Sequence, residues 1–110
     1  MPDEPLESEI LFRVKTPLGF YVRVTRAYWA FITTVKHPIM AGQEAEVEQA
    51  LSTPDEVRLS RIDPNMFLFY RLTRPKRWVC AVAKRPDDEA FLVTAYPTDA
   101  VKEGRTVWQR

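Results

Sequence analysis

The 110-residue sequence predicts a single α+β domain in which an N-terminal hairpin and two helices precede a four-stranded antiparallel meander. The length fits one compact domain. The spacing of apolar residues is helical in the first half of the chain and strand-like after Asp55. The connections between the late strand-like runs are short, which favours antiparallel neighbours. We therefore expect the helices to cover one face of the sheet and to leave the other face available to a ligand.

The first elements are expected to be two strands joined by a tight turn. Residues 10–15 and 20–24 are apolar runs rich in branched and aromatic side chains. Residues 16–19 between them contain a proline and a glycine, which mark a turn. These two runs therefore predict a hairpin.

Two helices are expected after the hairpin. Thr25 can cap the first, and Pro38 disfavours helical geometry at His37, so this helix is expected to end near His37. Its apolar residues are spaced at i, i+3, i+4 and i+7, namely Tyr28, Phe31, Ile32 and Val35. The second helix is expected between Gly42 and the Ser-Thr-Pro sequence at 52–54, with three glutamates in its early turns, where the helix dipole favours negative charge.

Four strands are expected in the second half of the chain. The strand-like runs cover residues 56–62, 66–73, 77–84 and 90–96. The segments between them each contain a proline beside charged or polar residues. Alternate residues along these runs differ in polarity, so the predicted sheet has two unlike faces.

The composition excludes several classes of protein. A hydrophobic content of 45% with 28% charged residues is that of a globular chain, and the apolar residues are too interrupted for a membrane span. Three scattered glycines exclude the glycine-rich loops of nucleotide-binding folds. The single cysteine, Cys80, excludes an internal disulfide and a cysteine zinc cage, and its apolar neighbours indicate a buried strand thiol.

The first nine residues are expected to be an acidic, disordered N-terminus that precedes a single domain over residues 10–110. Residues 1–9 contain four acidic side chains and two prolines. They lack the basic and apolar character of a signal or transit peptide. We therefore expect a cytoplasmic location.

The net charge of +1 conceals a separation of charge along the chain. The net charge is −4 over residues 1–9, +5 over 10–37, −5 over 38–57, +7 over 58–85 and −2 over 86–110. Eleven arginines against five lysines favour phosphate as a partner, because the planar guanidinium binds phosphate with two donors and stacks on bases. Ordinary solvation of exposed strand positions would explain the same charges. Under the phosphate interpretation, nucleic-acid contacts are expected from four cations of the +7 segment, namely Arg58, Arg74, Lys76 and Arg77.

The residues available for catalysis favour phosphoryl transfer without a metal or another cofactor. The chain has one histidine, His37, and its acidic triplet at 87–89 lies in a predicted hairpin tip, so a metal site is not expected. The serines have only His37 to share as a base and lie outside a nucleophile elbow. Arginines, a lysine, hydroxyls and one imidazole remain. Cations can stabilise the charge on phosphorus oxygens while an imidazole or phenol moves protons.

Several segments together resemble the phage-type nucleases of the barnase, EndoU, colicin and RelE-like (BECR) superfamily. The resemblance covers about three quarters of the chain. It is carried by His37-Pro38, VEQALSTPDEVRLSR at 47–61, LFYR at 68–71, the strand ending in Lys84, VTAYPTD at 93–99, and Lys102-Glu103-Gly104 before Val107-Trp108.

The resemblance implies a BECR-like fold and a small metal-independent ribonuclease of the kind found in phages, mobile elements and toxins. A 2′-hydroxyl of RNA would attack the adjacent phosphate and give a 2′,3′-cyclic phosphate and a 5′-hydroxyl end. RNA would be the substrate, and an antitoxin-like inhibitor protein a possible partner. The implied catalytic residues are His37 at the helix end and, on the strands, Arg61, Arg71, Lys84, Thr94 and Tyr96.

Each of these residues also has a purely structural interpretation. His37 can satisfy the last carbonyls of a helix, and Arg71 shares strand parity with Phe67 and Phe69, which suits a packing role. The alternative function is a non-catalytic module that binds nucleic acid or protein in a phage or mobile-element system. In that case the acidic segment 38–57 is a candidate docking surface. The two hypotheses differ in whether His37 and the cations converge on one site.

Overall fold

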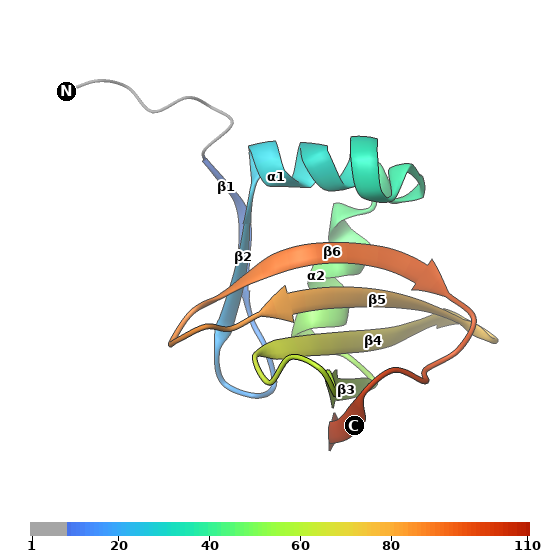
Figure 1. Ribbon diagram of the computed structural model, residues 1–110. Helices are drawn as coiled ribbons and strands as arrows, with labels where there is room; N and C mark the ends of the chain where they lie inside the picture. The colour runs from blue at the N-terminus through green and yellow to red at the C-terminus, as the bar shows by residue number, and fades with distance from the viewer. Residues whose placement is uncertain (1–8) are drawn as a thin grey trace.

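The computed structural model describes residues 9–110, and within them the strands form one mixed, seven-stranded sheet (Figure 1). The strand order across the sheet is β1-β2-β6-β5-β4-β3-β7. The elements in chain order are β1 (Ile10–Lys15), β2 (Tyr21–Thr25), α1 (Arg26–Phe31), the π-helical segment η2 (Ile32–Lys36), the 3-10 segment η3 (Pro38–Met40), α2 (Glu44–Ser52), β3 (Glu56–Leu59), β4 (Met66–Arg74), β5 (Arg77–Lys84), β6 (Ala90–Thr98) and β7 (Arg105–Gln109).

The predicted fold class, a hairpin and two helices followed by a four-stranded BECR-like meander, is wrong. The hairpin belongs to the same sheet, because β2 pairs in parallel with β6 through Val22/Ala90 and Arg23/Phe91. A seventh strand, β7, pairs antiparallel with β3 at the far edge. Pairing between strands this distant in sequence leaves no local pattern, whereas the hairpin turn and the short connections of β4–β6 do. The sequence therefore predicted parts of the sheet and missed how they join.

Two predicted elements are shorter or less regular than expected. The first helix is α-helical only to Phe31 and continues as η2, so that the His37 N–H donates to the Ile32 carbonyl five residues earlier at 2.7 Å. The strand predicted for residues 56–62 ends at Leu59. Beyond it, the Ser60 hydroxyl accepts hydrogen bonds from the N–H groups of Ile62 and Asp63, which turns the chain away from the ladder.

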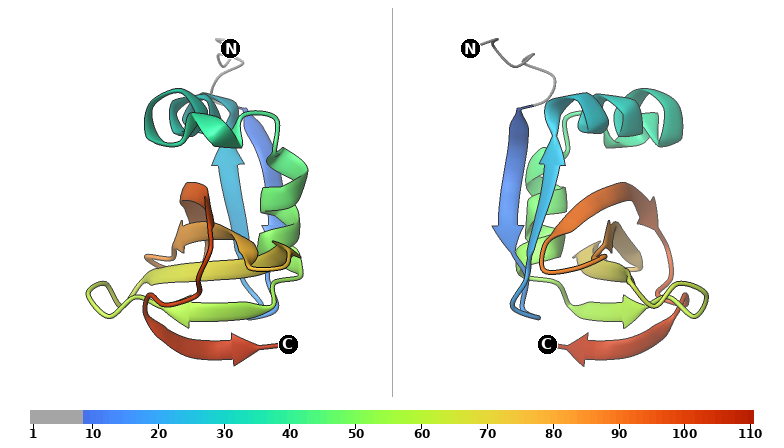
Figure 2. Two further views of the ribbon diagram at one scale, coloured as in Figure 1. Left: turned by 90° about the vertical axis from the view of Figure 1, so that its right-hand side faces the viewer. Right: turned by 60° about the vertical axis from the view of Figure 1, so that its left-hand side comes forward.

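The inner face of the sheet, defined as the side that α2 covers, holds the main core. Figure 2 shows the β1–β2 hairpin standing steeply against the strands of the meander, with α2 lying alongside it. Val47, Ala50 and Leu51 of α2 are fully buried there. Ala81 and Ala83 of β5 are also fully buried, and their small side chains let the helix pack close to the strand.

The opposite side of β3–β6, which we call the outer face, carries a second, smaller apolar cluster. Its buried members are Leu68, Tyr70, Cys80 and Val82. The loop between β6 and β7 passes this side of the sheet and packs Val101 against the cluster (Figure 2). The outer face is thus covered toward β7 and offers its exposed groups along β6.

Of the N-terminal segment expected to be disordered, residues 1–8 lie outside the described residues. Glu9 is described, and its carbonyl accepts a hydrogen bond from the Arg26 N–H at 2.9 Å. Among the helices of residues 9–110, none is both long and apolar enough to cross a membrane.

Gly104 places the β6–β7 loop against β3 in a way that only glycine allows. Its φ is +77°, and a Cβ atom there would lie 2.5 Å from the Leu59 carbonyl oxygen. Gly42 has a similar φ of +81° but nothing within 4 Å of a Cβ. We expect Gly104→Ala to lower the free energy of unfolding by about 1–3 kcal/mol more than Gly42→Ala, because both variants bear left-handed strain and only one adds a backbone clash. Urea unfolding followed by tryptophan fluorescence measures this difference, and equal losses would contradict it.

Candidate functional site on the outer face

His37 is held over the outer face by an irregular helix end. The threonines of η2 bond back to the preceding turn, with Thr34 Oγ1 donating to the Ala30 carbonyl at 2.6 Å. The π-helical turn and the following Pro38 then take the chain out of the helix at His37, whose φ and ψ are −143° and 79°. The imidazole ring lies 5.4 Å from the Tyr96 ring, centroid to centroid, at an interplanar angle of 41°. The half-buried His37 is therefore fixed against β6.

Tyr96 belongs to a row of side chains that crosses the outer face. The strand register aligns Glu56 with Tyr70, Tyr70 with Cys80, and Cys80 with Tyr96. Burial, with the neighbouring Cys80 thiol as a further cause, raises the pKa of both tyrosines well above the ordinary value. Burial also raises the pKa of Cys80, to about 12. All three groups are therefore protonated at neutral pH, and the thiol is neither a nucleophile nor a ligand.

Tyr96 lies opposite Cys80 in the strand register, and its ring packs against the ring of His37. Because the raised pKa keeps the phenol protonated, Tyr96 is a poor general base. The ring of Tyr96 sets the position of the His37 imidazole.

Two further predicted residues, Thr94 and Lys84, share the outer face. Thr94 lies opposite Val82, and its buried Oγ1 has no hydrogen-bond partner among residues 9–110. Lys84 lies opposite Met66, and its Nζ is 3.2 Å from Asp63 Oδ2. Four of the predicted catalytic residues are thus on one side of the sheet, namely His37, Lys84, Thr94 and Tyr96.

Arg61 is not a strand residue, contrary to expectation. It is exposed in the loop that follows β3. With Leu68, Lys102, Glu103 and Gly104, among others, it lines a cavity of about 390 Å³ at the end of the outer face. The guanidinium therefore borders the face from the side of the β6–β7 loop.

Arg71 is on the wrong side of the sheet for the predicted site. It lies opposite the buried Val79, and its Nη1 donates to the Thr53 carbonyl at 2.6 Å and to Thr53 Oγ1 at 2.9 Å. Thr53 is the C-cap residue of α2. Arg71 therefore binds the carboxyl end of this helix, where a cation is favourable.

The cations predicted to bind nucleic acid divide into two groups. Arg58 is on the outer face, but its Nε is 2.7 Å from Glu56 Oε2 and its Nη1 donates to the Gly104 carbonyl. Arg74, Lys76 and Arg77 are exposed at the β4–β5 hairpin tip. Arg74 and Arg77 border a separate groove of about 480 Å³ there, together with residues of η3 and α2. The +7 segment is thus dispersed over the molecule.

Sequence reasoning missed residues that the sheet topology brings to the same face. Because Arg13 pairs with Arg23, Arg23 with Phe91, and Phe91 with Lys84, a row of three cations and one aromatic ring crosses β1, β2, β6 and β5. Glu103 was part of the resembling sequence but received no role, and its charge contributes to the raised pKa of Tyr96 after burial and Cys80. Only the parallel β2–β6 pairing could have revealed the cationic row.

Comparisons of the chain with protein-family models, with curated proteins and with solved structures found no match. The resemblance to BECR nucleases therefore remains a prediction. Within residues 9–110, no three histidine, cysteine, aspartate or glutamate side chains gather in a group suited to a metal ion.

The ion pair of Glu56 makes a pH-dependent contribution to stability. Burial alone would raise the pKa of Glu56, but hydrogen bonds from Thr106 and Arg58 lower it below the ordinary value. A carboxylate with a lowered pKa stabilises the fold above the unfolded-state pKa of about 4.3, and this contribution is lost as the pH falls through the lower folded-state value.

We therefore expect the free energy of unfolding to fall between about pH 6 and pH 3 by a smaller amount in Glu56→Gln than in the wild type. Urea unfolding at several pH values measures this difference. Glu48→Gln on α2 is the matched control, because Glu48 has no ion pair within residues 9–110. Parallel pH curves for wild type and Glu56→Gln would contradict the assignment.

Proposed function

We propose that this chain is a metal-independent endoribonuclease of the BECR type that uses the outer face around His37. The observation that carries the proposal is the contact between the His37 and Tyr96 rings, at 5.4 Å between centroids. It fixes the chain's one imidazole on the face that also presents Lys84 and to which the buried Thr94 belongs. A proton-transfer group and a cation on one face suit phosphoryl transfer.

In the proposed reaction the 2′-oxygen of a ribose forms a bond to the adjacent phosphorus, and the bond from phosphorus to the 5′-oxygen breaks. The 2′-hydroxyl loses a proton, and the leaving 5′-oxygen gains one. His37 serves one of these two transfers, because Tyr96 is held protonated. The products are a 2′,3′-cyclic phosphate and a 5′-hydroxyl, and the reaction needs no oxidant, reductant or metal.

The cations that bind the RNA backbone in this proposal are Lys84 and Arg61, and Lys84 lies four residues along β5 from the Cys80–Tyr96 pair that carries His37. Lys84 is already paired with Asp63, so phosphate must compete with a carboxylate for it. Arg61 is exposed beside the face, and its guanidinium forms no ion pair with a carboxylate within residues 9–110. Arg71 is left out of the reaction, because its guanidinium is bound to the end of α2 on the inner face.

The first test is cleavage of mixed single-stranded RNA in the presence of a chelator. We expect cyclic-phosphate ends from RNA and no cleavage of DNA of the same sequence, because DNA lacks the 2′-hydroxyl. His37→Ala and His37→Gln should each lower the rate about 100-fold or more, as loss of a proton-transfer group does.

Rates are normalised to the folded fraction measured by circular dichroism, since His37 also begins η3. A requirement for a divalent ion, or equal cleavage of DNA, would refute the mechanism. Equal normalised rates for wild type and both variants would exclude His37 from the chemistry. Binding of RNA without cleavage would support the alternative of a non-catalytic module.

The second test separates the ring of Tyr96 from its hydroxyl. Tyr96→Phe keeps the surface on which His37 rests, so we expect its kcat to stay within about 10-fold of the wild type. Tyr96→Leu removes that surface, and we expect kcat to fall by about 100-fold with little change in KM, as for a misplaced catalytic group. Steady-state kinetics on one short RNA measures both constants. A large loss of kcat in Tyr96→Phe would instead assign a direct role to the hydroxyl.

A further inference from the structure

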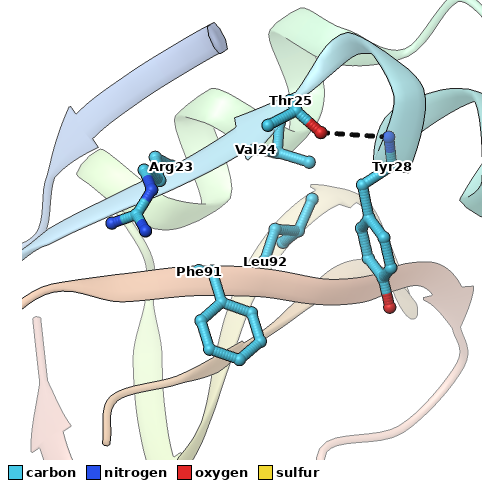
Figure 3. Close-up of a pocket in the computed structure, with 6 residues that line it drawn as sticks. All are labelled: Arg23, Val24, Thr25, Tyr28, Phe91 and Leu92. Atoms are coloured by element: carbon cyan, nitrogen blue, oxygen red, sulfur yellow. Dashed lines mark hydrogen bonds between the residues drawn. The ribbon is translucent and has the colours of Figure 1, made fainter. Parts of the chain in front are cut away.

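A separate cavity opens where β2 and β6 move apart. The two strands share only two residue pairs, and beyond Arg23/Phe91 they diverge beneath the start of α1. The cavity between them has a volume of about 260 Å³ and is lined by Arg23, Val24, Thr25, Tyr28, Phe91 and Leu92 (Figure 3). Its volume is just below the lower limit of about 300 Å³ for pockets that hold drug-sized ligands. It therefore suits a small planar group rather than a large ligand.

One wall of this cavity is a rigid aromatic ring. The Tyr28 hydroxyl donates to the Val93 carbonyl at 2.9 Å, and the Tyr28 N–H donates to Thr25 Oγ1 at 3.1 Å. Lys36 Nζ lies 3.1 Å from both the Tyr28 hydroxyl and the Val93 carbonyl. The ring is thus held at both ends, and binding a ligand against it costs little side-chain entropy.

A second aromatic ring stands at the mouth of the cavity. Phe91 is 39% exposed although it lies in the interior of the sheet, between Arg23 on β2 and Lys84 on β5. Figure 3 shows the rings of Phe91 and Tyr28 apart from each other, with Leu92 between them. An exposed ring flanked by cations on two neighbouring strands offers a stacking surface next to positive charge.

The charges around the cavity favour an anionic ligand. Arg23 Nη1 is 3.9 Å from Glu89 Oε1, whereas the same carboxylate oxygen is 2.5 Å from Arg13 Nε. Glu89 is therefore engaged mainly by Arg13, and the Arg23 guanidinium, 43% exposed, keeps donors for another partner. Lys36, whose Nζ contacts the hydroxyl of the lining residue Tyr28, adds a second positive charge nearby. An uncharged apolar peptide would leave these cations uncompensated.

We propose that this cavity is a nucleobase subsite, in which one base of a single-stranded RNA stacks on Phe91 at the cavity mouth while a neighbouring phosphate binds Arg23. The RNA then follows β6 toward Thr94 and Tyr96, which lie further along that strand, and toward His37, which packs on Tyr96. The inference rests on the proposed RNA substrate, but it assigns a recognition site that is separate from the reaction at His37. Base stacking accepts any base, so the subsite anchors the strand without strong sequence preference.

The experiment uses a fluorescent 2′-O-methyl oligoribonucleotide, which cannot react because its 2′-oxygen is blocked. Fluorescence anisotropy gives the Kd for wild type and variants at several salt concentrations. We expect Phe91→Ala to weaken binding about 5- to 150-fold, the range for loss of one base–aromatic stack, and Phe91→Trp to retain it. Arg23→Gln should reduce the slope of log Kd against log salt by about 0.7, the value for one phosphate contact on a single strand.

Two controls make the result specific. Leu72→Ala removes an apolar side chain of similar exposure, 45%, from the far end of β4 and should leave the Kd unchanged. An abasic oligonucleotide of equal length carries the phosphates without bases, and its affinity should be the same for wild type and Phe91→Ala. Circular dichroism confirms that each variant is folded.

The outcomes separate this inference from the proposed catalysis. A wild-type Kd that Phe91→Ala leaves unchanged, or an equal loss of affinity for the abasic probe, would overturn the base subsite even if RNA is cleaved. A Phe91-dependent Kd in a protein that does not cleave RNA would support the subsite and refute the nuclease. Failure of the wild type to bind the probe would overturn the subsite.

Discussion

The parallel pairing of β2 with β6 is the constraint on which the remaining architecture depends. Only two residue pairs, Val22/Ala90 and Arg23/Phe91, join the hairpin to the meander. They join the antiparallel hairpin and the antiparallel meander into one mixed sheet. The hairpin and the meander meet at an angle, and α2 packs beside it (Figure 2). Because α1 follows β2 without a loop, the same pairs place the beginning of α1 directly above β6. The helix then runs above β6 (Figure 1), and beyond its end His37 contacts Tyr96 of this strand.

The same geometry explains why an irregular helix suits this position. β6 pairs with β2 only at its beginning, so its carbonyls beyond Phe91 need other partners. The Val93 carbonyl receives two, from Tyr28 of α1 and Lys36 of η2. Both bonds tie the helical segment to the strand at Val93. The widened π-helical turn before His37 and Pro38 after it place His37 against Tyr96.

What could be predicted from the sequence was local. The hairpin turn, the strands of the meander and the span of α2 each follow from patterns within about ten residues. The sequence left open whether Arg71 on β4 has a packing role or a functional one. Its hydrogen bond to the end of α2 shows that it lies on the inner face. The end of β3 at Leu59 depends on one hydroxyl, that of Ser60, which competes with the ladder. The parallel pair, β7 and the Arg23–Phe91 row require contacts between residues far apart in the chain, so no local period encodes them.

The distribution of ion pairs indicates how an anionic ligand would meet this surface. Arg13, Arg58 and Lys84 are each held by a carboxylate, on Glu89, Glu56 and Asp63 respectively. Such pairs keep the cations oriented, but a phosphate gains from them only by displacing or sharing the carboxylate. Arg23 and Arg61 are less engaged and lie toward opposite ends of the outer face. The register aligns Arg23 with Phe91, Phe91 with Lys84 and Lys84 with Met66, beside the loop that carries Arg61, so a strand that spans both cations crosses the Phe91 end of the face. Tyr96 and His37 lie further along β6, so an RNA strand held by these cations reaches His37 by turning from this row along β6.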